Sequence, residues 1–333
     1  MMETILVTGG AGYVGSGFLR LLLKEGYQVI CVDKLMFGGE SILDIATNPN
    51  FHFYRVDVND YIAFEKVLRN YTYLAVVHLA AIVGDPACKR EAELATLTNW
   101  TSSKWLLDRC LELKIPRFAF ASTCSNYGKM TDPKTYVTEE SKLAPVSLYA
   151  ELKVKFENYL IHEIPKYDWF APTALRFSTV YGMSPRMRFD LTVNEFTKDA
   201  VQGKLLEIFG EQFWRPYCHV KDFSRAFLTV LRAPKNKVAY DVFNVGDTNE
   251  NYTKQMLVEE LSKQIPEIKV KYIKKDEDPR DYRVNSDKIK TRLGFNISMT
   301  VPEGIAEIKQ VVENGIIQNP NNQRYYNIPV MES

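Results

Sequence analysis

The sequence predicts an α/β protein with a doubly wound parallel sheet and a smaller, mixed α/β lobe. Short apolar runs rich in β-branched residues alternate with amphipathic stretches through the first half of the 333 residues. This alternation is typical of parallel strands that are covered by helices on both faces. A glycine-rich turn, "VTGGAGYVGS", joins the first apolar run to the first amphipathic stretch. After about residue 183 the pattern becomes mixed, which indicates a second, smaller unit.

The individual elements follow from the apolar periodicity. The strands of the large sheet are expected in "TILV", "QVICVD", "FHFYRVD", "YLAVVHLA", "RFAFAST" and "WFAPTALRF", with a further strand in "YDVFNVG". The helices between them are expected in "GSGFLRLLLKEGY" and at about 61–70, 92–113 and 147–164, and later ones at 252–265 and 301–314.

Composition narrows the class of protein. The formal net charge is +1, with 46% hydrophobic and 25% charged residues, so we expect neither a nucleic acid nor a membrane surface as the main partner. The five cysteines are widely spaced and form no C-x-x-C, so we expect no metal site, no disulfide framework and a reducing, cytoplasmic compartment. The N-terminal stretch breaks into glycines too early for a secretory signal, and no apolar run approaches the length of a membrane span.

The glycine-rich turn predicts a dinucleotide site. Gly9, Gly12 and Gly15 satisfy G-x-x-G-x-x-G, and Gly10 with Gly12 and Gly15 satisfies G-x-G-x-x-G. Glycines without Cβ atoms allow a tight turn and let the backbone approach a pyrophosphate, which sits on the N-terminus of the following helix. A tight turn without a ligand would show the same pattern, but strand, turn and helix follow in the required order. The sheet is therefore expected to be of the Rossmann type.

Two aspartates at strand ends extend this site. Asp33 closes the second strand, 18 residues beyond Gly15, where a carboxylate accepts hydrogen bonds from ribose hydroxyls and repels a 2′-phosphate. We therefore expect NAD rather than NADP, although Lys34 is adjacent. Asp57 ends the third strand and is either a contact of the adenine amine or a loop cap. The dinucleotide domain is expected to comprise residues 1–182 with about 213–247. The substrate-binding lobe comprises 183–212 with about 248–315, and the polar tail 316–333 is a mobile end or an oligomer contact.

Tyr149 and Lys153 lie four residues apart in "SLYAELKVKFE", a predicted helix. A tyrosine with a pKa near 10 is a poor base at neutral pH, but an adjacent ammonium and a positive nicotinamide ring favour the phenolate. Tyr217 and Lys221 have the same spacing in "YCHVK", but this segment is expected to be extended, which would separate them by about 13 Å. Only the first pair can therefore act together as neighbours on one helix.

Together, "TGGAGYVGS", "HLAA", "ASTCSNYG" and Y-x-x-x-K resemble the extended short-chain dehydrogenase/reductase family of nucleotide-sugar epimerases and dehydratases, as far as about residue 295. The resemblance implies a nucleotide-diphosphate sugar as the substrate and Thr123, Tyr149 and Lys153 as catalytic residues. It implies that NAD contacts Gly9, Gly12, Tyr13, Val14, Gly15, Asp33, Asp57, Val58, Leu79, Ala80, Ala81, Asn99, Tyr149 and Lys153.

The residues after Thr123 narrow the reaction. Family 4,6-dehydratases resemble S-T-D-E-V-Y-G here, whereas this chain has Cys124 and Ser125, neither of which replaces a carboxylic acid readily. Cys124 is either an acid/base thiol, as in relatives that epimerise next to a ketone, or a packed small residue; we favour the packed residue, because the cysteine of those relatives matches position 125. The segments "VGDPACKR", "SPRMRFDLTVNEFT", "FWRPYCHVKD" and "DPRDYRVNSDK" resemble enzymes that oxidise C4 of GDP-manno-heptose for bacterial capsules. A nucleotide-sugar 4-epimerase is the alternative, and a 4,6-dehydratase or a non-catalytic NAD-binding protein is less favoured.

Arginines are suited to a nucleotide diphosphate because a guanidinium binds phosphate oxygens in a bidentate manner. The resemblance places Arg215, Arg280 and Asn194 on the diphosphate. Arg186 and Arg188 are further candidates near the sugar or phosphate. The loop "VGDPACKR" is expected to border the sugar, with Asp85 and Lys89 as its candidate contacts. Family members pair through two long helices, here 92–113 and 147–164, so we expect a homodimer.

Overall fold

The computed structural model describes residues 2–130, 132, 135–275 and 280–327. Its largest element is a seven-stranded sheet in the order β10-β6-β5-β4-β1-β2-β3, whose neighbours are all parallel. The strands are β1 (Thr4–Thr8), β2 (Gln28–Val32), β3 (Phe51–Tyr54), β4 (Ala75–His78), β5 (Arg117–Thr123), β6 (Ala171–Phe177) and β10 (Asp241–Val245). The order reverses between β1 and β4, so this is the doubly wound, Rossmann-type sheet that the sequence predicts.

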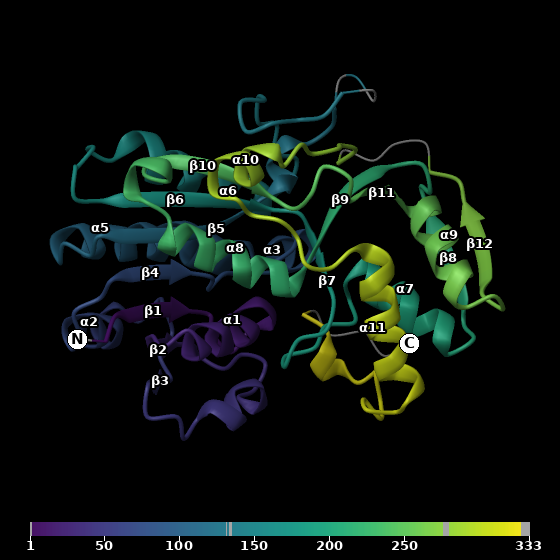
Figure 1. Ribbon diagram of the computed structural model, residues 1–333, viewed down its shortest axis with the longest axis horizontal. Helices are drawn as coiled ribbons and strands as arrows, with labels where there is room; N and C mark the ends of the chain where they lie inside the picture. Colours follow the sequence, from purple (N-terminus) through teal and green to yellow (C-terminus); the bar gives the residue numbers. More distant parts are fainter. Residues whose placement is uncertain (1, 131, 133–134, 276–279, 328–333) are drawn as a thin grey trace.

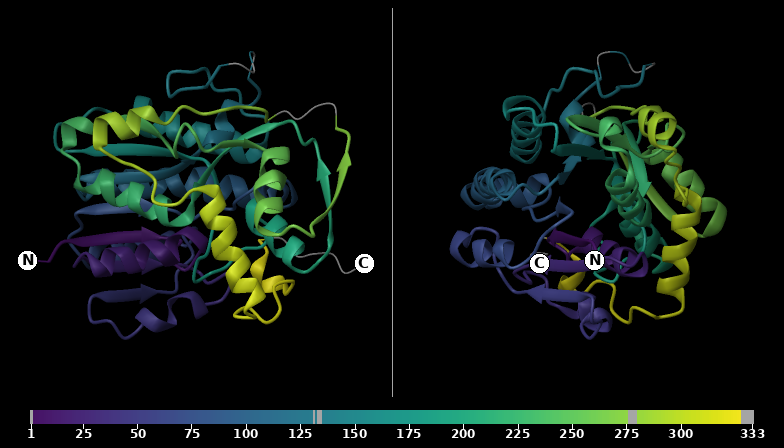
Figure 2. Two further views of the ribbon diagram at one scale, coloured as in Figure 1. Left: turned by 45° about the vertical axis from the view of Figure 1, so that its right-hand side comes forward. Right: turned by 60° about the vertical axis from the view of Figure 1, so that its left-hand side comes forward.

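Helices cover both faces of this sheet (Figures 1 and 2). On one face Phe18 of α1 packs against Phe227 of α8 with ring centroids 5.5 Å apart. On the other face Phe156 of α6 meets Phe120 of β5 at 4.6 Å. The covering helices are α1 (Tyr13–Lys24) and α8 (Val220–Arg232) on the first face, and α2 (Tyr61–Arg69), α5 (Ser103–Glu112) and α6 (Leu148–Asn158) on the second. The strands are accordingly buried on both faces, which explains their continuous apolar runs.

Three predicted elements differ in detail from the structure. The segment 92–113 is α4 (Ala92–Thr96), a π-helical turn (Leu97–Ser102) and α5 in succession, and α6 likewise continues into a π-helical turn (Tyr159–Glu163). The expected loop "VGDPACKR" is mostly the short helix α3 (Asp85–Arg90), which begins after Gly84 with Pro86 in its first turn. Short 3-10 helices lie at Glu40–Ile45, Cys124–Tyr127, Lys235–Lys237 and Gln323–Tyr325, and α10 spans Asp287–Leu293.

A smaller lobe lies beside the large sheet and has its own apolar core (Figure 1). It contains a three-stranded sheet, β11-β9-β7, and a two-stranded parallel sheet, β12-β8. Its elements are β7 (Thr179–Tyr181), α7 (Thr192–Val201), β8 (Leu205–Phe209), β9 (Trp214–His219), β11 (Asn251–Thr253), α9 (Lys254–Gln264), β12 (Lys269–Ile273) and α11 (Val301–Glu313). The segment that we expected to belong to the dinucleotide domain, about 213–247, is therefore shared. Its strand β9 pairs with β7 and β11, whereas α8 and β10 belong to the large sheet.

We expected the segment that contains Tyr217 and Lys221 to be extended, but only its first part is a strand. It changes from β9 to α8 after His219, and the His219 side chain caps the helix by accepting a hydrogen bond from the Lys221 backbone N–H at 3.2 Å. Tyr217 is buried in the lobe core, while the exposed Lys221 ammonium pairs with Glu307 at 2.6 Å. The conclusion that these two side chains do not cooperate holds, but for a different reason.

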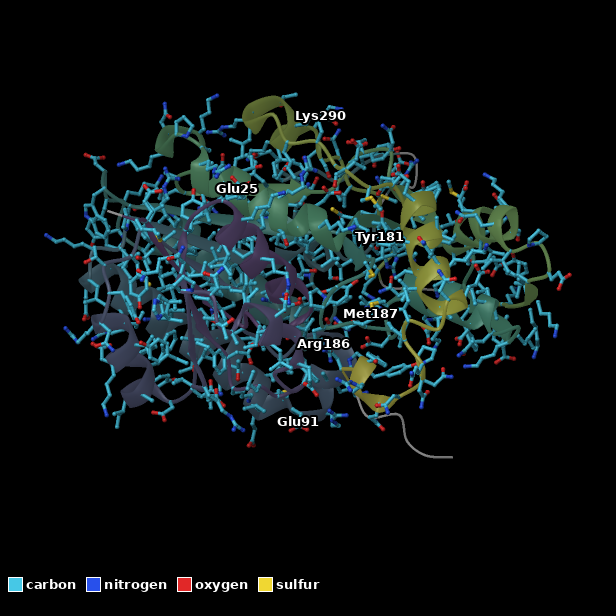
Figure 3. All side chains as sticks on the ribbon, turned by 60° about the horizontal axis from the view of Figure 1, so that its bottom comes forward. Glu25, Glu91, Tyr181, Arg186, Met187 and Lys290 are labelled. Atoms are coloured by element: carbon cyan, nitrogen blue, oxygen red, sulfur yellow. The ribbon has the colours of Figure 1, made fainter. Side chains whose placement is uncertain are left out.

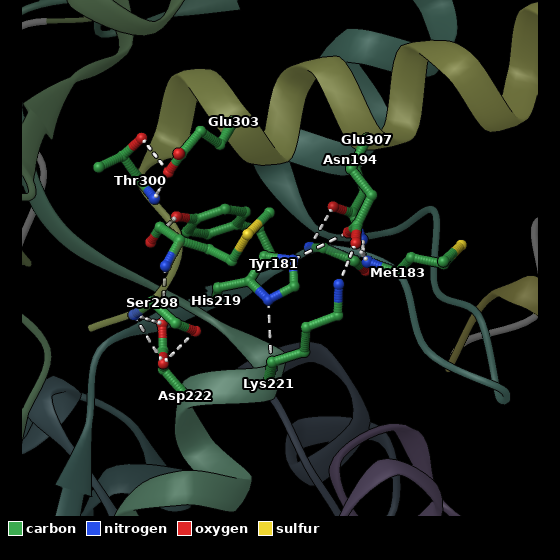
Figure 4. Close-up of polar contacts among 12 residues, drawn as sticks. Tyr181, Met183, Asn194, His219, Lys221, Asp222, Ser298, Thr300, Glu303 and Glu307 are labelled. Atoms are coloured by element: carbon green, nitrogen blue, oxygen red, sulfur yellow. Dashed lines mark hydrogen bonds and ion pairs between the residues drawn. The ribbon is translucent and has the colours of Figure 1, made fainter. Parts of the chain in front are cut away.

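Glu307 connects α11 to two segments that are distant from it in sequence, at Met183 and at His219 with Lys221 (Figure 4). One carboxylate oxygen accepts hydrogen bonds from the Met183 backbone N–H at 2.7 Å and from His219 Nε2 at 2.9 Å, and the other accepts from Lys221 Nζ. The His219 ring proton is on Nε2, because Nδ1 accepts the Lys221 N–H. Burial acts to raise the pKa of Glu307, but hydrogen bonds from His219 and Lys221 outweigh it and lower the pKa to about 2.

This junction continues to the glycine-rich turn. Gly182 follows β7 with φ +104°, and an added Cβ would lie 1.9 Å from His219 Nε2, so only glycine fits there. The Gly182 carbonyl accepts a hydrogen bond from the Tyr13 hydroxyl at 2.5 Å, and the Ser184 hydroxyl donates to the Tyr13 carbonyl at the same distance. The turn that begins α1 is thus hydrogen-bonded directly to the smaller lobe.

Part of the C-terminal tail packs against the smaller lobe, and whether the tail is a mobile end or an oligomer contact stays a prediction. Tyr325 and Tyr326 pack against a small cluster that includes Met187 and Phe189. The Phe189 N–H donates to the Tyr325 carbonyl at 2.9 Å, and Lys198 Nζ donates to the Tyr326 hydroxyl at 2.8 Å. Residues 328–333 of the predicted tail lie outside the described residues. Among the residues that the structure describes, no helix is long and apolar enough to span a membrane.

Candidate active site

A cavity of about 420 Å³ lies at the carboxyl ends of the large sheet, where α/β proteins of this topology bind ligands. It brings together nearly all the residues that the sequence singled out. The predicted cofactor and catalytic residues that line it are Gly9, Gly12, Tyr13, Val14, Gly15, Asp33, Asp57, Val58, Leu79, Ala80, Ala81, Thr123, Tyr149 and Lys153, and the predicted substrate residues are Arg186 and Arg188. Asn99, Asn194, Arg215 and Arg280 are not part of this lining.

The glycine turn has the close backbone packing that a phosphate cradle needs. Gly9 has φ +72°, and an added Cβ would lie 2.7 Å from the Ala80 backbone nitrogen. A Cβ on Gly15 would lie 2.4 Å from the Gly9 carbonyl oxygen. These contacts draw β1, the turn and α1 together beside the cavity, and the first N–H groups of a helix have no partner within the helix. A pyrophosphate therefore fits at the N-terminus of α1.

Asp33 is held in place by two backbone donors. Its carboxylate accepts hydrogen bonds from the Ala11 N–H at 3.0 Å and the Leu35 N–H at 2.8 Å, and burial raises its pKa above the ordinary value. Asp57 accepts from the Asn59 N–H at 3.0 Å and pairs with Lys34 at 3.1 Å. The loop-cap role foreseen for Asp57 is therefore present. The contact with an adenine amine stays a prediction, although Asp57 does line the cavity.

The catalytic candidates converge from β5 and α6. The Thr123 hydroxyl oxygen accepts the Ser125 N–H at 3.1 Å, so one lone pair is used and the hydroxyl proton can be donated to a ligand. Lys153 Nζ donates to the Ala121 carbonyl at 2.8 Å and lies 5.9 Å from the centroid of the Tyr149 ring. Burial lowers the pKa of Lys153 to about 8. Lys153 is thus fixed between the end of β5 and the phenol, one helical turn from Tyr149.

The pKa of Tyr149 departs from our expectation in direction. We expected a neighbouring ammonium to favour the phenolate, but burial raises the pKa of Tyr149 above its ordinary value. Cys88 and Asp85 also raise this pKa, whereas Arg188 lowers it. The desolvation of the phenolate outweighs the positive charges of the protein around it. Additional positive charge at the cavity is therefore needed before Tyr149 can act as a base near neutral pH.

Two asparagines predicted at the site brace it from outside the cavity. The Asn99 side chain accepts the Ile82 N–H at 2.8 Å and donates to the Ile82 carbonyl at 2.9 Å, which supports the segment after Ala81. The Asn194 side chain accepts the Gly182 N–H at 2.8 Å and donates to the Arg188 carbonyl at 2.8 Å. A direct contact of either side chain with a ligand stays a prediction.

Arg215 and Arg280 gather around a tyrosine that the sequence did not single out. The Arg215 guanidinium lies 5.5 Å from the Tyr282 ring centroid. Burial raises the pKa of Tyr282 to about 12, against the opposing effect of Arg215, of a hydrogen bond with Ser125, and of Arg280. These residues therefore lie beside the strand end that carries Thr123. Their role in diphosphate binding stays a prediction.

Asp85 links α3 to the helix of Tyr149. Its carboxylate accepts from the Ser147 hydroxyl, the N-cap of α6, at 2.6 Å and from Arg280 at 2.6 Å. Lys89 is exposed. Cys124 is buried, and its thiol donates to the Arg176 carbonyl at 3.2 Å, which agrees with the packed role expected for it.

Several cavity residues escaped the sequence-based reasoning, notably Phe37, Thr98, Ser178 and Asn327. An aromatic side chain shortly after Asp33 could have indicated Phe37. Asn327 is distant in sequence from every motif, and its position depends on how the tail folds back.

A glycine cradle at a helix N-terminus, a ribose-binding carboxylate and a tyrosine–lysine pair in one cavity define a dinucleotide-dependent oxidoreductase. The model of the NAD dependent epimerase/dehydratase family matches residues 5–246. The chain therefore belongs to this family, the resemblance to extended short-chain dehydrogenases/reductases is confirmed, and the protein is an NAD-dependent enzyme.

Relatives from several bacteria align with this chain over most of its length and of theirs. The UDP-glucose 4-epimerase of Lactobacillus helveticus is 29% identical over 313 residues, which cover 87% of this chain and 91% of the relative. The dTDP-glucose 4,6-dehydratase of Streptomyces niveus is 29% identical over 318 residues, covering 91% and 90%. The crystal structure of the UDP-glucose 4-epimerase of Thermotoga maritima with UDP-glucose superposes with a TM-score of 0.82 at 28% identity, covering 94% of this chain and 100% of that chain.

Proposed function

We propose that this protein oxidises a hydroxyl group of a nucleotide-diphosphate sugar, at C4, to a ketone with NAD. The observation that carries the proposal is that Thr123, Tyr149 and Lys153 line the same cavity as the glycine turn and Asp33. An alcohol can therefore lie between the hydroxyl and phenol groups while its carbon faces the dinucleotide cleft.

The roles of the side chains follow from their contacts. The Thr123 hydroxyl donates a hydrogen bond to the substrate oxygen, and the Tyr149 phenolate removes the O–H proton. Lys153, held by the Ala121 carbonyl, stabilises the phenolate with its ammonium group. Bound NAD supplies the hydride acceptor and the positive nicotinamide charge that lowers the pKa of a nearby phenol. The C–H bond then breaks as the C=O bond forms, so that the two electrons leave with the hydride and the proton stays on Tyr149.

For the substrate, we propose a GDP-heptose oxidised for capsular polysaccharide synthesis. The proposal is supported by the resemblance of residues 83–90, 184–197, 213–222 and 278–288 to enzymes that oxidise C4 of GDP-manno-heptose. Arg215 and Arg280 would hold the diphosphate, because they lie around Tyr282 beside the Thr123 strand end. Asn194 would contact the same group, and Arg188 the sugar or phosphate.

A nucleotide-sugar 4-epimerase is the second candidate, and the UDP-glucose 4-epimerases among the relatives favour it. Both reactions share the oxidation at C4. In an epimerase the hydride returns to the other face of the ketone, whereas in a dehydrogenase the ketone is released. A 4,6-dehydratase is less favoured, because Cys124 is a buried thiol whose pKa is raised by burial and does not act as an acid.

We also propose a homodimer formed through residues 92–113 and 147–164, and a cytoplasmic location. The division into a dinucleotide domain and a substrate lobe is part of the same proposal. It is supported by the separate apolar core of the lobe.

The experiment incubates the purified protein with NAD and a panel of nucleotide sugars, including GDP-manno-heptose and UDP-glucose. Reduced nicotinamide is followed by absorbance and products by mass spectrometry. Stoichiometric ketone with reduced nicotinamide indicates a dehydrogenase, and an isomeric product without net reduction indicates an epimerase. The absence of both with every sugar would contradict the proposed substrate class.

Tyr149→Phe tests the assigned base. We expect at least about a 100-fold loss of turnover with NAD binding retained, because only the proton acceptor is removed. Tyr217→Phe is the matched control, since Tyr217 has the same Tyr-x-x-x-Lys spacing but is buried in the lobe core. Equal turnover in the two variants would refute the role of Tyr149.

A further inference from the structure

Two residues that line the cavity each carry a buried polar atom that has no hydrogen-bond partner among the described residues. These atoms are Arg186 Nε, which is a donor, and Asn327 Oδ1, which is an acceptor. Only 6% of Arg186 is exposed, and a buried polar group without a partner is costly. A ligand that presents an acceptor to the Arg186 guanidinium and a donor to the Asn327 amide would give both side chains partners after a small shift of each.

Arg186 lies on the cofactor side of the cavity. Its guanidinium is 4.1 Å from the ring centroid of Phe37, which follows Asp33 by four residues and also lines the cavity. The next arginine, Arg188, lies 5.9 Å from the ring centroid of Tyr13 in the glycine turn. Arg186 is thus placed beside Phe37 and close enough to Tyr13, at the start of α1, for the two side chains to interact electrostatically. By contrast, Arg215 and Arg280 lie near Tyr282.

The C-terminal segment completes this wall. Tyr325 and Asn327 are fixed to the lobe by the Phe189 N–H and by the Asp190 carboxylate, which accepts the Asn327 N–H at 3.1 Å. Arg324 reaches in the other direction and pairs with Glu40, in the segment after β2, at 3.2 Å. Figure 3 labels Arg186 and Met187 beside this C-terminal segment. Residues 324–327 therefore connect the lobe to the loop after Asp33, across the outer side of the cavity.

We propose that Arg186 and Asn327 form the outer half of the NAD site, with Arg186 holding the cofactor diphosphate and Asn327 accepting a hydrogen bond from the same ligand. This inference rests on the proposed function and assigns Arg186 to the cofactor rather than to the substrate. Diphosphate oxygens are the acceptors that a guanidinium binds most strongly. Burial, with Arg188 nearby, lowers the pKa of Arg186 to about 10, so an anion at this wall would compensate a buried charge. The cofactor is then enclosed between the glycine turn and the C-terminal segment.

The test measures dissociation constants by titration calorimetry for NAD and ADP, and for UDP and GDP with NAD present. Arg186→Gln should weaken the binding of NAD and of ADP about 10- to 100-fold, as expected for a lost charged hydrogen bond. The dissociation constants of UDP and GDP should change less than about 2-fold. Asn327→Ala should weaken NAD about 2- to 10-fold. Asn327→Asp should weaken NAD further, because it adds a negative charge near the phosphates. The matched control is Arg232→Gln, an exposed arginine paired with Glu25 outside the cavity.

The outcomes separate this inference from the proposed function. Weaker UDP or GDP binding by Arg186→Gln with unchanged NAD binding would place Arg186 in the substrate site and overturn the inference. Unchanged NAD binding in all the Arg186 and Asn327 variants would also overturn it. Thermal melts identify misfolded variants. If Arg186→Gln does not fold, the NAD dissociation constants of Arg186→Lys and of the two Asn327 variants test the inference instead. A wild-type protein that binds NAD but oxidises no nucleotide sugar would contradict the proposed function alone.

Discussion

Replacing Glu307 by glutamine should destabilise the junction between the smaller lobe and the glycine turn. The folded pKa of Glu307 is about 2, against an ordinary 4.5, and 13% of its side chain is exposed. At about 1.4 kcal/mol per pKa unit, the ionised carboxylate contributes about 3 kcal/mol to the free energy of unfolding at neutral pH. The glutamine amide group has the same shape but must place N–H donors against Lys221 or against the Met183 N–H and His219.

The expected shift follows from the size of the chain. An unfolding entropy of about 2 cal/mol/K per residue over 333 residues gives a loss of about 4 °C in Tm for 3 kcal/mol. Differential scanning calorimetry at pH 7 measures this shift. The matched control is Glu313→Gln on the same helix, where 45% of the side chain is exposed and its pair with Lys309 is 3.3 Å long. Such exposed pairs contribute about 0–1 kcal/mol, so this variant should lose at most about 1 °C.

The pH dependence supplies a second readout. Because the folded pKa of Glu307 is lowered, its stabilisation is present above the ordinary value of 4.5 and is lost as the pH falls toward about 2. The difference in Tm between wild type and Glu307→Gln should therefore narrow below pH 4.5. The facing titratable groups, His219 and Lys221, are the same in both proteins. Equal Tm values at pH 7, or a difference that does not change with pH, would refute the reasoning.

Three further outcomes are expected. Gly15→Ala should weaken NAD binding strongly, because its Cβ would lie 2.4 Å from the Gly9 carbonyl oxygen. Titration calorimetry measures the NAD affinity, and an unchanged affinity would show that the turn can open to accept the methyl group. The turnover rate should pass through a maximum with pH, rising as Tyr149 ionises and falling as the Lys153 ammonium, whose pKa burial lowers to about 8, is lost; a rate that rises without a maximum up to pH 10 would contradict this role of Lys153. Asp33→Ala should reduce the preference for NAD over NADP at least about 10-fold, as measured by the ratio of their dissociation constants.

Much of the fold was predictable because short stretches of sequence determine it. A parallel strand buried on both faces needs an uninterrupted apolar run, and the run that contains Ile5 to Val7 shows this directly. The glycine turn could be recognised because each glycine meets a neighbour close in sequence or on the adjacent strand, such as Gly9 at Ala80. The cofactor half of the candidate site was predicted largely for this reason.

The contacts that the sequence did not reveal are long-range. Glu307 joins His219 and Lys221 across some ninety residues, and no local pattern marks such a pair. The end of β9 also escaped, since the His219 cap is visible only once the ring is seen to accept the Lys221 N–H. The tail looked featureless because its order depends on surfaces formed elsewhere, on Phe189 and Asp190.

The five cysteines are all free and buried, so the rate at which each thiol is alkylated measures how often its surroundings unfold. Burial raises the pKa of Cys88 to about 11, so very little of the reactive thiolate is present at neutral pH. Alkylation must therefore await local or global unfolding, and each thiol reports its own region. Cys88 lies in α3 near Tyr149, whereas Cys110 lies on the buried face of α5. The difference between their labelling rates would measure how often the catalytic end of the sheet opens independently of the rest.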